Sequence, residues 1–164
     1  MSEPSGWRWL PVTAAVIGLD QLTKYLIVQH VKLYSSIYVL PVLDISLRYN
    51  RGAAFSLLEG ASGWQRWFFT LLAIAVGITI IVWMRRLQGA TQWLLSLALA
   101  LILAGALGNM IDRLRLGYVI DFIVAHWQRA EFPAFNVADS AITVGAALLL
   151  LDAFFESRRA ARAA

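Results

Sequence analysis

Two uninterrupted apolar stretches, at residues 67–84 and 93–111, constrain this chain more than any other feature of its sequence. Neither contains a charged residue, and each is close to the roughly 20 apolar residues that a helix needs to cross the hydrocarbon core of a bilayer. The composition agrees, because 60% of the residues are hydrophobic and 15% are charged, against roughly 45–50% and about 25% in soluble domains. The chain is therefore expected to be an integral membrane protein.

Two further stretches have the length of a membrane span but contain ionisable residues. Asp20 and Lys24 interrupt the one near the N-terminus, and Asp139 and Asp152 interrupt the one near the C-terminus. A cleaved signal peptide is the alternative for the first stretch, which has no basic leader beyond Arg8 and no small-residue cleavage site after it. We expect one membrane domain, residues 1–164, with four transmembrane helices at about 9–31, 67–84, 93–112 and 137–155.

Basic residues indicate the orientation of these helices. Cytoplasmic loops of membrane proteins are enriched in Lys and Arg. Here arginines cluster in the link between the second and third stretches and in the C-terminal tail: Arg85, Arg86, Arg158, Arg159 and Arg162. Both segments are expected to face the cytoplasm, and an even number of spans then places the N-terminus there too. The net charge of +4 reflects such flanking residues, so no nucleic-acid partner is expected.

The outward-facing segments are too long to be simple connectors. In residues 44–50, polar and apolar residues alternate and place Ile45 and Leu47 on one face, as in a strand. We expect a small β-structure within about 34–58 and an outer loop at about 113–136. The expected fold class is an all-α integral membrane protein with a small β-structure on its outer side.

Ionisable side chains at membrane depth cost roughly 2.5–3.5 kcal/mol each on insertion scales, so each needs a structural or functional reason. Asp20 and Lys24 lie four residues apart on one helix face, with the acid first, which favours an ion pair. Mutual neutralisation is their simplest role. The pair is also placed to brace a polar site between helices, and the sequence leaves both roles open.

Asp121 and Asp139 are expected to meet at one surface of the membrane. The third helix ends near Ile111 and the fourth begins near Asn136, which is suited to cap it, so the segment between them emerges on a single side. Asp121 lies within that segment, and Asp139 lies in the first turn of the fourth helix. Further polar residues gather at the same place: Asn109, Asp112 and Arg113.

Two carboxylates at one site suit peptide hydrolysis without a metal or a covalent nucleophile. When like acids share one proton, one group acts as a base toward water and the other as an acid toward the carbonyl oxygen. In the alternative interpretation, Asp139 only complements the dipole of its helix, and Asp121 pairs with Arg113 or Arg115. Spacing alone does not separate these interpretations.

Other hydrolytic sites have less support. Residues 60–63, GASG, are similar to the serine motif of rhomboid proteases but lie in an expected loop. His30 and His126 lie outside the helical interiors, and no HExxH spacing is present. The chain has no cysteine, which excludes thiolate metal sites and cysteine nucleophiles. We expect no metal and no cofactor.

Five blocks, in order along nearly the whole chain, resemble those of the lipoprotein signal peptidases, or signal peptidase II, of bacterial membranes. They are DQLTK at 20–24, NRGAAFS at 50–56, GALGNMIDR at 105–113, VIDF at 119–122 and FNVADS at 135–140. The resemblance implies four membrane helices with a small β-cradle on the outer side. It also implies the reaction, which is cleavage of a prolipoprotein on the N-terminal side of a lipobox cysteine that already carries diacylglycerol.

The resemblance assigns roles to individual residues. Asp121 and Asp139 are implied to be the catalytic dyad of an aspartyl endopeptidase. Phe55 and Ser56 are expected cradle contacts, and Ala104 is a departure, because relatives often have glycine there. Substrate-binding or supporting roles are implied for Asp20, Lys24, Asn50, Gly52, Gly108, Asn109, Arg113, Asn136 and Ala138.

The implied partners are the diacylglyceryl-prolipoprotein substrate and membrane phospholipid. The implied location is the bacterial cytoplasmic (inner) membrane, where a multi-pass monomer would have both termini in the cytoplasm and its active site toward the periplasm. Two rivals from other classes are a small proton-coupled transporter, whose acids would be spread through the bilayer, and a non-catalytic membrane scaffold. The gathering of acids at one surface favours the peptidase.

Overall fold

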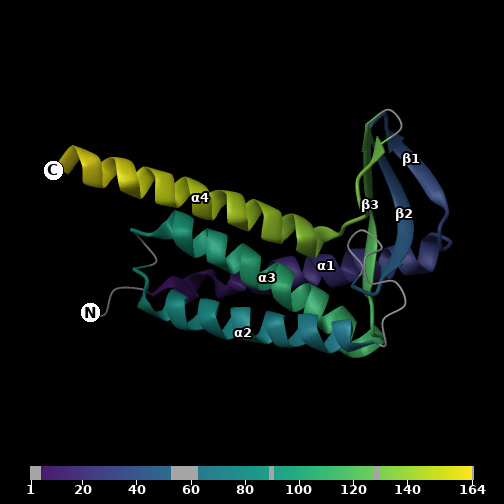
Figure 1. Cartoon of the computed structure of the whole chain (residues 1–164), viewed down its shortest axis with the longest axis horizontal. Coiled ribbons are helices and arrows are strands. Elements are labelled where there is room, and N and C mark those ends of the chain that lie inside the picture. The colour runs from purple at the N-terminus through teal and green to yellow at the C-terminus, as the bar shows by residue number, and fades with distance from the viewer. Residues whose placement is uncertain (1–4, 53–62, 89–90, 128–129, 164) are drawn as a thin grey trace.

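A computed structural model of the chain describes residues 5–52, 63–88, 91–127 and 130–163. Within these ranges, four long helices lie side by side, and a small sheet stands across one end of the bundle (Figure 1). The helices are α1 (Leu10–His30), α2 (Trp64–Arg86), α3 (Trp93–Leu116) and α4 (Val137–Ala163), and a short 3-10 helix, η1 (Gly6–Trp9), precedes α1. η1 and the C-terminal end of α4 both lie at the end remote from the sheet (Figure 1).

Three helices in the described part of the chain are long and apolar enough to cross a membrane: Trp64–Arg86, Trp93–Leu116 and Val137–Ala161. Helix α1 has 21 residues, which is the length of a span, but its polar residues lower its mean hydropathy. Two of them, Asp20 and Lys24, are only 0% and 2% exposed. The exposed surface of α1 carries apolar residues such as Leu19, Leu22 and Leu26, so its charged residues face the interior of the bundle.

The ends of three helices differ from the expected positions. Helix α3 runs to Leu116 rather than 112 and stops at Gly117, whose φ of 85° suits glycine as a helix C-cap. Helix α4 continues to Ala163 rather than 155. The polar residues after 155 end the apolar stretch, but they are compatible with a helix. Helix α2 begins at Trp64, three residues before the expected 67.

Helix α3 is central, because it contacts α1, α2 and α4. Small residues allow α4 to approach it closely. A Cβ atom at Gly105 would overlap the carbonyl oxygen of Ala138, and one at Gly145 would lie 2.7 Å from that of Ala98. Lipid tails are as apolar as most side chains, so helices in a membrane associate through such close packing rather than through the hydrophobic effect. The contact holds the first turn of α4 against α3.

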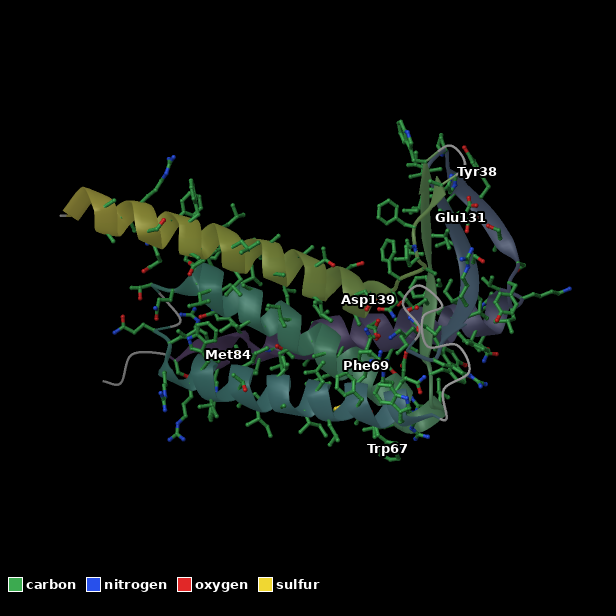
Figure 2. All side chains as sticks on the ribbon, viewed as in Figure 1. Tyr38, Trp67, Phe69, Met84, Glu131 and Asp139 are labelled. Carbon is green, nitrogen blue, oxygen red and sulfur yellow. The ribbon has the colours of Figure 1, made fainter. Side chains whose placement is uncertain are left out.

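Apolar side chains fill the end of the bundle that is remote from the sheet, where Figure 2 labels Met84. This cluster lies mainly between α2 and α3 and contains Ile80, Met84, Leu87, Leu95, Leu99 and Leu103. A smaller cluster of Val31, Leu47 and Ile120 joins the end of α1 to the sheet. The second cluster anchors the sheet to the bundle.

The sheet has four antiparallel strands in the order β1 (Ser36–Leu40), β2 (Leu43–Asn50), β3 (Val119–Trp127) and β4 (Ala130–Glu131). β2 lies where the alternating pattern predicts a strand. β3 lies in the segment that we expected to be a loop. Its first four residues are all buried, and a strand buried on both faces reads as a continuous apolar run without alternation.

A β-bulge breaks the alternation of β2. The β2 partners of Ile123 and Asp121 are three residues apart, whereas Ile123 and Asp121 themselves are two apart on β3. The consecutive residues at the bulge, Ser46 and Leu47, are both buried. Beyond the bulge, Asn50 lies on the same face of the sheet as Asp121 and reaches its carboxylate.

Replacing Gly105 with alanine is expected to destabilise the bundle. The added methyl group would overlap Ala138 and Ile142, so α3 and α4 must separate, at a cost of about 1–3 kcal/mol. Gly18→Ala on α1 is the matched control, because nothing lies within 4 Å of the added atom and alanine favours a helix by up to about 1 kcal/mol. Thermal unfolding should give a lower Tm for the first variant only; equal shifts would contradict the close contact.

Candidate active site

The two candidate catalytic aspartates lie together at the sheet end of the bundle. Asp121 is on β3 and is 2% exposed. Asp139 is in the first turn of α4, where Figure 2 shows it beside the sheet. Asn136 contacts both, because its Nδ2 donates to Asp121 Oδ1 at 2.7 Å and its backbone N–H donates to Asp139 Oδ2 at 3.2 Å. The chain topology therefore does bring the two acids to one place.

Asn136 also begins helix α4. Its Oδ1 accepts the backbone N–H of Asp139 at 2.9 Å, while Asp139 Oδ2 accepts the backbone N–H of Asn136. These reciprocal bonds form a capping box, which satisfies N–H groups that the first helical turn leaves unpaired. Asp139 thus does serve the start of its helix, as the alternative interpretation expects, and Asn136 also links it to Asp121.

Asn109 on α3 is the second amide at the site. Its Nδ2 donates to Asp139 Oδ1 at 2.7 Å. Its Oδ1 accepts from Asn136 Nδ2 and from Lys24 Nζ, each at 3.1 Å. Because every polar atom of this buried amide is engaged, its orientation is fixed, and it binds the Asp139 carboxylate oxygen that the helix cap does not use.

Asn50 on β2 holds the other aspartate. Its Nδ2 donates to Asp121 Oδ2 at 3.0 Å, and its Oδ1 accepts the backbone N–H of Gly52 at 2.9 Å. Gly52 has a φ of 102°, and a Cβ atom there would lie 3.1 Å from the ring of Phe69. Both the backbone conformation and the space therefore require glycine at this turn.

A buried lysine lies beneath the dyad. Lys24 Nζ is 2.8 Å from Asp20 Oδ2 and 2.8 Å from Asp112 Oδ2. The predicted Asp20–Lys24 pair is confirmed, but it is part of a larger cluster, because Asp20 Oδ1 also accepts the backbone N–H of Ala138 at 2.9 Å. Gly108 makes room for this cluster, since a Cβ atom there would lie 2.8 Å from Asp20 Oδ2.

Arg113 lies at the edge of the site. Its guanidinium group is 5.0 Å from the centre of the Phe69 ring, and its Nη1 donates to the Asn109 carbonyl oxygen at 3.4 Å. Among the residues with described coordinates, neither Arg113 nor Arg115 forms an ion pair with Asp121. The alternative pairing is therefore absent, and Asp121 is bound by two neutral amides instead.

The surroundings change the acidity of Asp121. Burial and the nearby Asp139 carboxylate raise the pKa of Asp121 to about 7, against the opposing effects of the Asn50 and Asn136 hydrogen bonds and of Lys24. An acid with this pKa holds a proton near neutral pH while its neighbour supplies a carboxylate. The arrangement can therefore offer an acid and a base side by side.

The sequence did not reveal the partners of Asp112. Its carboxylate accepts from Ile120 N–H at 3.1 Å and from Gln21 Nε2 at 2.9 Å. The sequence placed Asp112 among the polar residues at the end of the third helix, but no local pattern identifies contacts with Gln21, 91 residues away. Phe55, Ser56 and most of the GASG segment lie outside the described residues.

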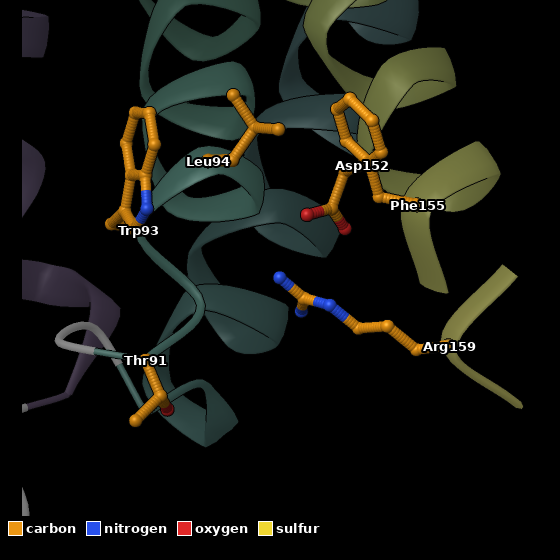
Figure 3. A pocket seen from close by; sticks show the side chains of 6 residues that line it. All are labelled: Thr91, Trp93, Leu94, Asp152, Phe155 and Arg159. Carbon is orange, nitrogen blue, oxygen red and sulfur yellow. The ribbon is translucent and has the colours of Figure 1, made fainter. Parts of the chain in front are cut away.

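A hollow of about 280 Å³ lies far from the dyad, between the start of α3 and the C-terminal part of α4 (Figure 3). Asp152 and Arg159 line it together with apolar groups such as Trp93. Its remoteness excludes it as the place where the dyad would act. In the described ranges, no three acidic or histidine side chains are grouped as metal ligands would be.

Comparison with known proteins identifies the family. The profile of the family described as "Signal peptidase (SPase) II" matches residues 12–155. A lipoprotein signal peptidase of Pseudomonas aeruginosa (strain UCBPP-PA14) is 52% identical over 158 residues, which are 95% of this chain and 92% of that protein. One of Shewanella halifaxensis (strain HAW-EB4) is 49% identical over 152 residues, 93% and 89% of the two chains.

Solved structures agree. A bacterial membrane enzyme determined by the in meso method at 2.3 Å resolution has a TM-score of 0.80 at 32% identity, covering 92% of this chain and 89% of that chain. A second, at 1.9 Å resolution, has a TM-score of 0.75 at 33% identity, covering 88% and 90%. By sequence profile, relatives and fold, the chain belongs to the signal peptidase II family, the lipoprotein signal peptidases.

Proposed function

We propose that this protein is an aspartyl endopeptidase that removes the signal peptide from prolipoproteins, cutting on the N-terminal side of the diacylglyceryl-modified cysteine. Membership of the lipoprotein signal peptidases supports peptide cleavage rather than proton-coupled transport. The observation that carries the aspartyl mechanism is the bridge through Asn136, which contacts both Asp121 and Asp139. The side-chain amide of Asn136 donates to Asp121, and its backbone N–H donates to Asp139.

In the proposed reaction, the dyad begins with one proton between its two carboxyl groups. The ionised group takes a proton from water as the water oxygen attacks the scissile carbonyl carbon, and the protonated group donates its proton to the carbonyl oxygen. Collapse of the resulting diol breaks the C–N bond. The leaving nitrogen takes the proton from the aspartate that deprotonated the water. A hydroxyl of the diol gives its proton to the other aspartate, so the dyad again holds a single proton.

Three polar residues are proposed to support this chemistry. Asn109 and Asn136 fix the carboxylates of the dyad by hydrogen bonds of 2.7 Å each. Arg113, stacked against Phe69 at the edge of the site, is placed to bind a carbonyl oxygen of the substrate backbone. Groups held by packing and hydrogen bonds need little rearrangement during the reaction, which lowers its barrier.

We further propose that α1 also spans the membrane, as the first of four spans in a single, monomeric membrane domain in the bacterial inner membrane. Its charged residues are paired inside the bundle, while its outer surface is apolar. Arginine-rich helix ends then lie in the cytoplasm, and the sheet and dyad face the periplasm. The acyl chains of the substrate lie in the bilayer beside the helices, next to membrane phospholipid. The membrane thereby orients the scissile bond.

Asp121→Asn and Asp139→Asn should each lower the rate of signal-peptide release by at least about 10²–10⁴-fold, because each removes the acid or the base. Peptide release from a diacylated prolipoprotein by purified enzyme measures the effect, with thermal unfolding to show that each variant folds. Glu156→Gln is the control, because that exposed acid lies in the C-terminal part of α4, remote from the sheet and the dyad (Figure 1). Near-normal turnover in either aspartate variant would exclude the dyad mechanism.

The rate should fall as the pH rises above about 7. Ionisation of Asp121, whose pKa burial and Asp139 raise to about 7, leaves two carboxylates and no acid for the carbonyl oxygen. The kcat/KM, which reports the free enzyme, should then decrease about tenfold for each further pH unit, because one proton is lost. A kcat/KM that stays constant or increases between pH 7 and 9 would contradict a dyad that works with one shared proton.

A diacylated substrate should be cleaved in preference to the same precursor without lipid. Acyl chains held in the bilayer concentrate and orient the scissile bond, whereas the unlipidated precursor lacks this anchor. The two forms of one precursor are compared by kcat/KM with the enzyme in lipid. Equal values, or a preference for the unlipidated form, would exclude the proposed substrate class.

A further inference from the structure

Asp112 is a buried acid that charge balance does not explain. Lys24 and Asp20 neutralise each other within α1, so Asp112, 3% exposed, adds a second carboxylate to the same ammonium group. Among the described residues, no other cation lies within ion-pair distance of it. Burial of a charge costs several kcal/mol even when it is partly paired, so a residue of this kind needs a structural or functional reason.

The two carboxylates beneath the dyad make equivalent contacts with the backbone. Asp20 Oδ1 accepts the N–H of Ala138 at 2.9 Å, and Ala138 directly precedes Asp139. Asp112 Oδ2 accepts the N–H of Ile120 at 3.1 Å, and Ile120 directly precedes Asp121. Each carboxylate therefore holds the residue next to one member of the dyad, on α4 in one case and on β3 in the other.

Gln21 links the two carboxylates. Its Nε2 donates to Asp112 Oδ1 at 2.9 Å and to Asp20 Oδ2 at 3.1 Å, and it lies 3.3 Å from the Gly108 carbonyl oxygen. Lys24 bridges the same carboxylates from the other side, at 2.8 Å to each. Gln21 and Lys24 on α1 thus fix the distance between Asp20 and Asp112. These two carboxylates in turn hold α4, which carries Asp139, and β3, which carries Asp121.

We propose that Asp112 and Gln21 are positioning residues, which set the distance and alignment of Asp121 relative to Asp139 by holding β3 against the start of α4. Neither touches the reacting atoms. The proposal rests on the proposed function, because it gives these residues a role in the reaction of the dyad.

The cluster also contributes to the charge around the dyad. The charged groups around Asp121 are Asp139 on α4, Lys24 on α1 and Arg113 on α3, and Asp112 acts on Lys24 and Arg113. Strand β2 contributes the neutral Asn50 and also Arg48, which lies opposite Asp121 in the strand register and pairs with Glu131 on β4. Asp112→Asn removes one negative charge near the dyad and so favours its ionised form. The fall in kcat/KM at high pH should then begin at lower pH than in the wild type.

Gln21→Leu separates alignment from charge. It removes the link between the two carboxylates but no charge, so kcat should fall while the onset of the high-pH decrease stays unchanged. A misplacement of about 1 Å can cost about 10²-fold in rate, and we expect a decrease of about 10–100-fold in both variants. Because neither residue contacts the substrate, KM should change by less than about twofold.

The experiment measures kcat, KM, the pH dependence of kcat/KM and thermal unfolding for Asp112→Asn and Gln21→Leu, with Glu156→Gln as the control. Glu156 is 64% exposed, 4.0 Å from Arg159 in the C-terminal part of α4, and its replacement should change none of these. The proposal is supported if kcat falls at temperatures where each variant is fully folded, and if only Asp112→Asn moves the high-pH decrease.

Wild-type kcat in a folded Gln21→Leu variant would overturn the proposal, as would a decrease that only follows the loss of folded protein. Gln21→Leu decides the question if Asp112→Asn does not fold. These outcomes differ from failure of the proposed function. If the proposed function is wrong, Asp121→Asn or Asp139→Asn retains activity. If only the positioning role is wrong, both of those variants are inactive while Gln21→Leu keeps the wild-type kcat.

Discussion

The buried ammonium group of Lys24 is the interaction on which the arrangement of the site depends. It lies among Asp20, Asp112 and Asn109, which come from two helices and are linked in turn to α4 and β3. In an environment of low polarity, an unpaired charge is far more costly than in water. Loss of one of these partners therefore leaves the remaining polar groups unsatisfied and weakens the contacts of α1 and α3 with α4 and β3.

Close helix packing and polar contacts stabilise different parts of the bundle. Small residues such as Gly105 and Gly108 allow α3 and α4 to approach closely and leave space for the carboxylate of Asp20. Large apolar side chains such as Met84 fill the remote end. Because the surrounding lipid gives little reason for helices to associate, the specific contacts near the dyad both place the site and contribute to the stability of the bundle.

Much of the architecture could be predicted because it depends on local patterns. Apolar length indicated the helices that contain residues 67–84 and 93–111, the four-residue spacing indicated the Asp20–Lys24 pair, and the order of the elements placed Asp121 near Asp139. The strand β3 was missed because a buried strand has no alternation. The contacts of Asp112 were missed because they join residues distant in sequence, and the bulge in β2 arises from pairing with β3 rather than from β2 itself.

The position of both Asp20 and Lys24 on one helix has a consequence for how the protein is made. As the proposed first span, α1 is synthesised before α3. Residues four apart can pair as soon as the helix forms, so the segment can enter the bilayer without carrying two separate charges, each costing about 2.5–3.5 kcal/mol. When α3 follows, Asp112 joins an ammonium group that is already in place. Asp20 and Lys24 lower the hydropathy of α1, but the same two residues provide the binding site for Asp112 when α3 is inserted.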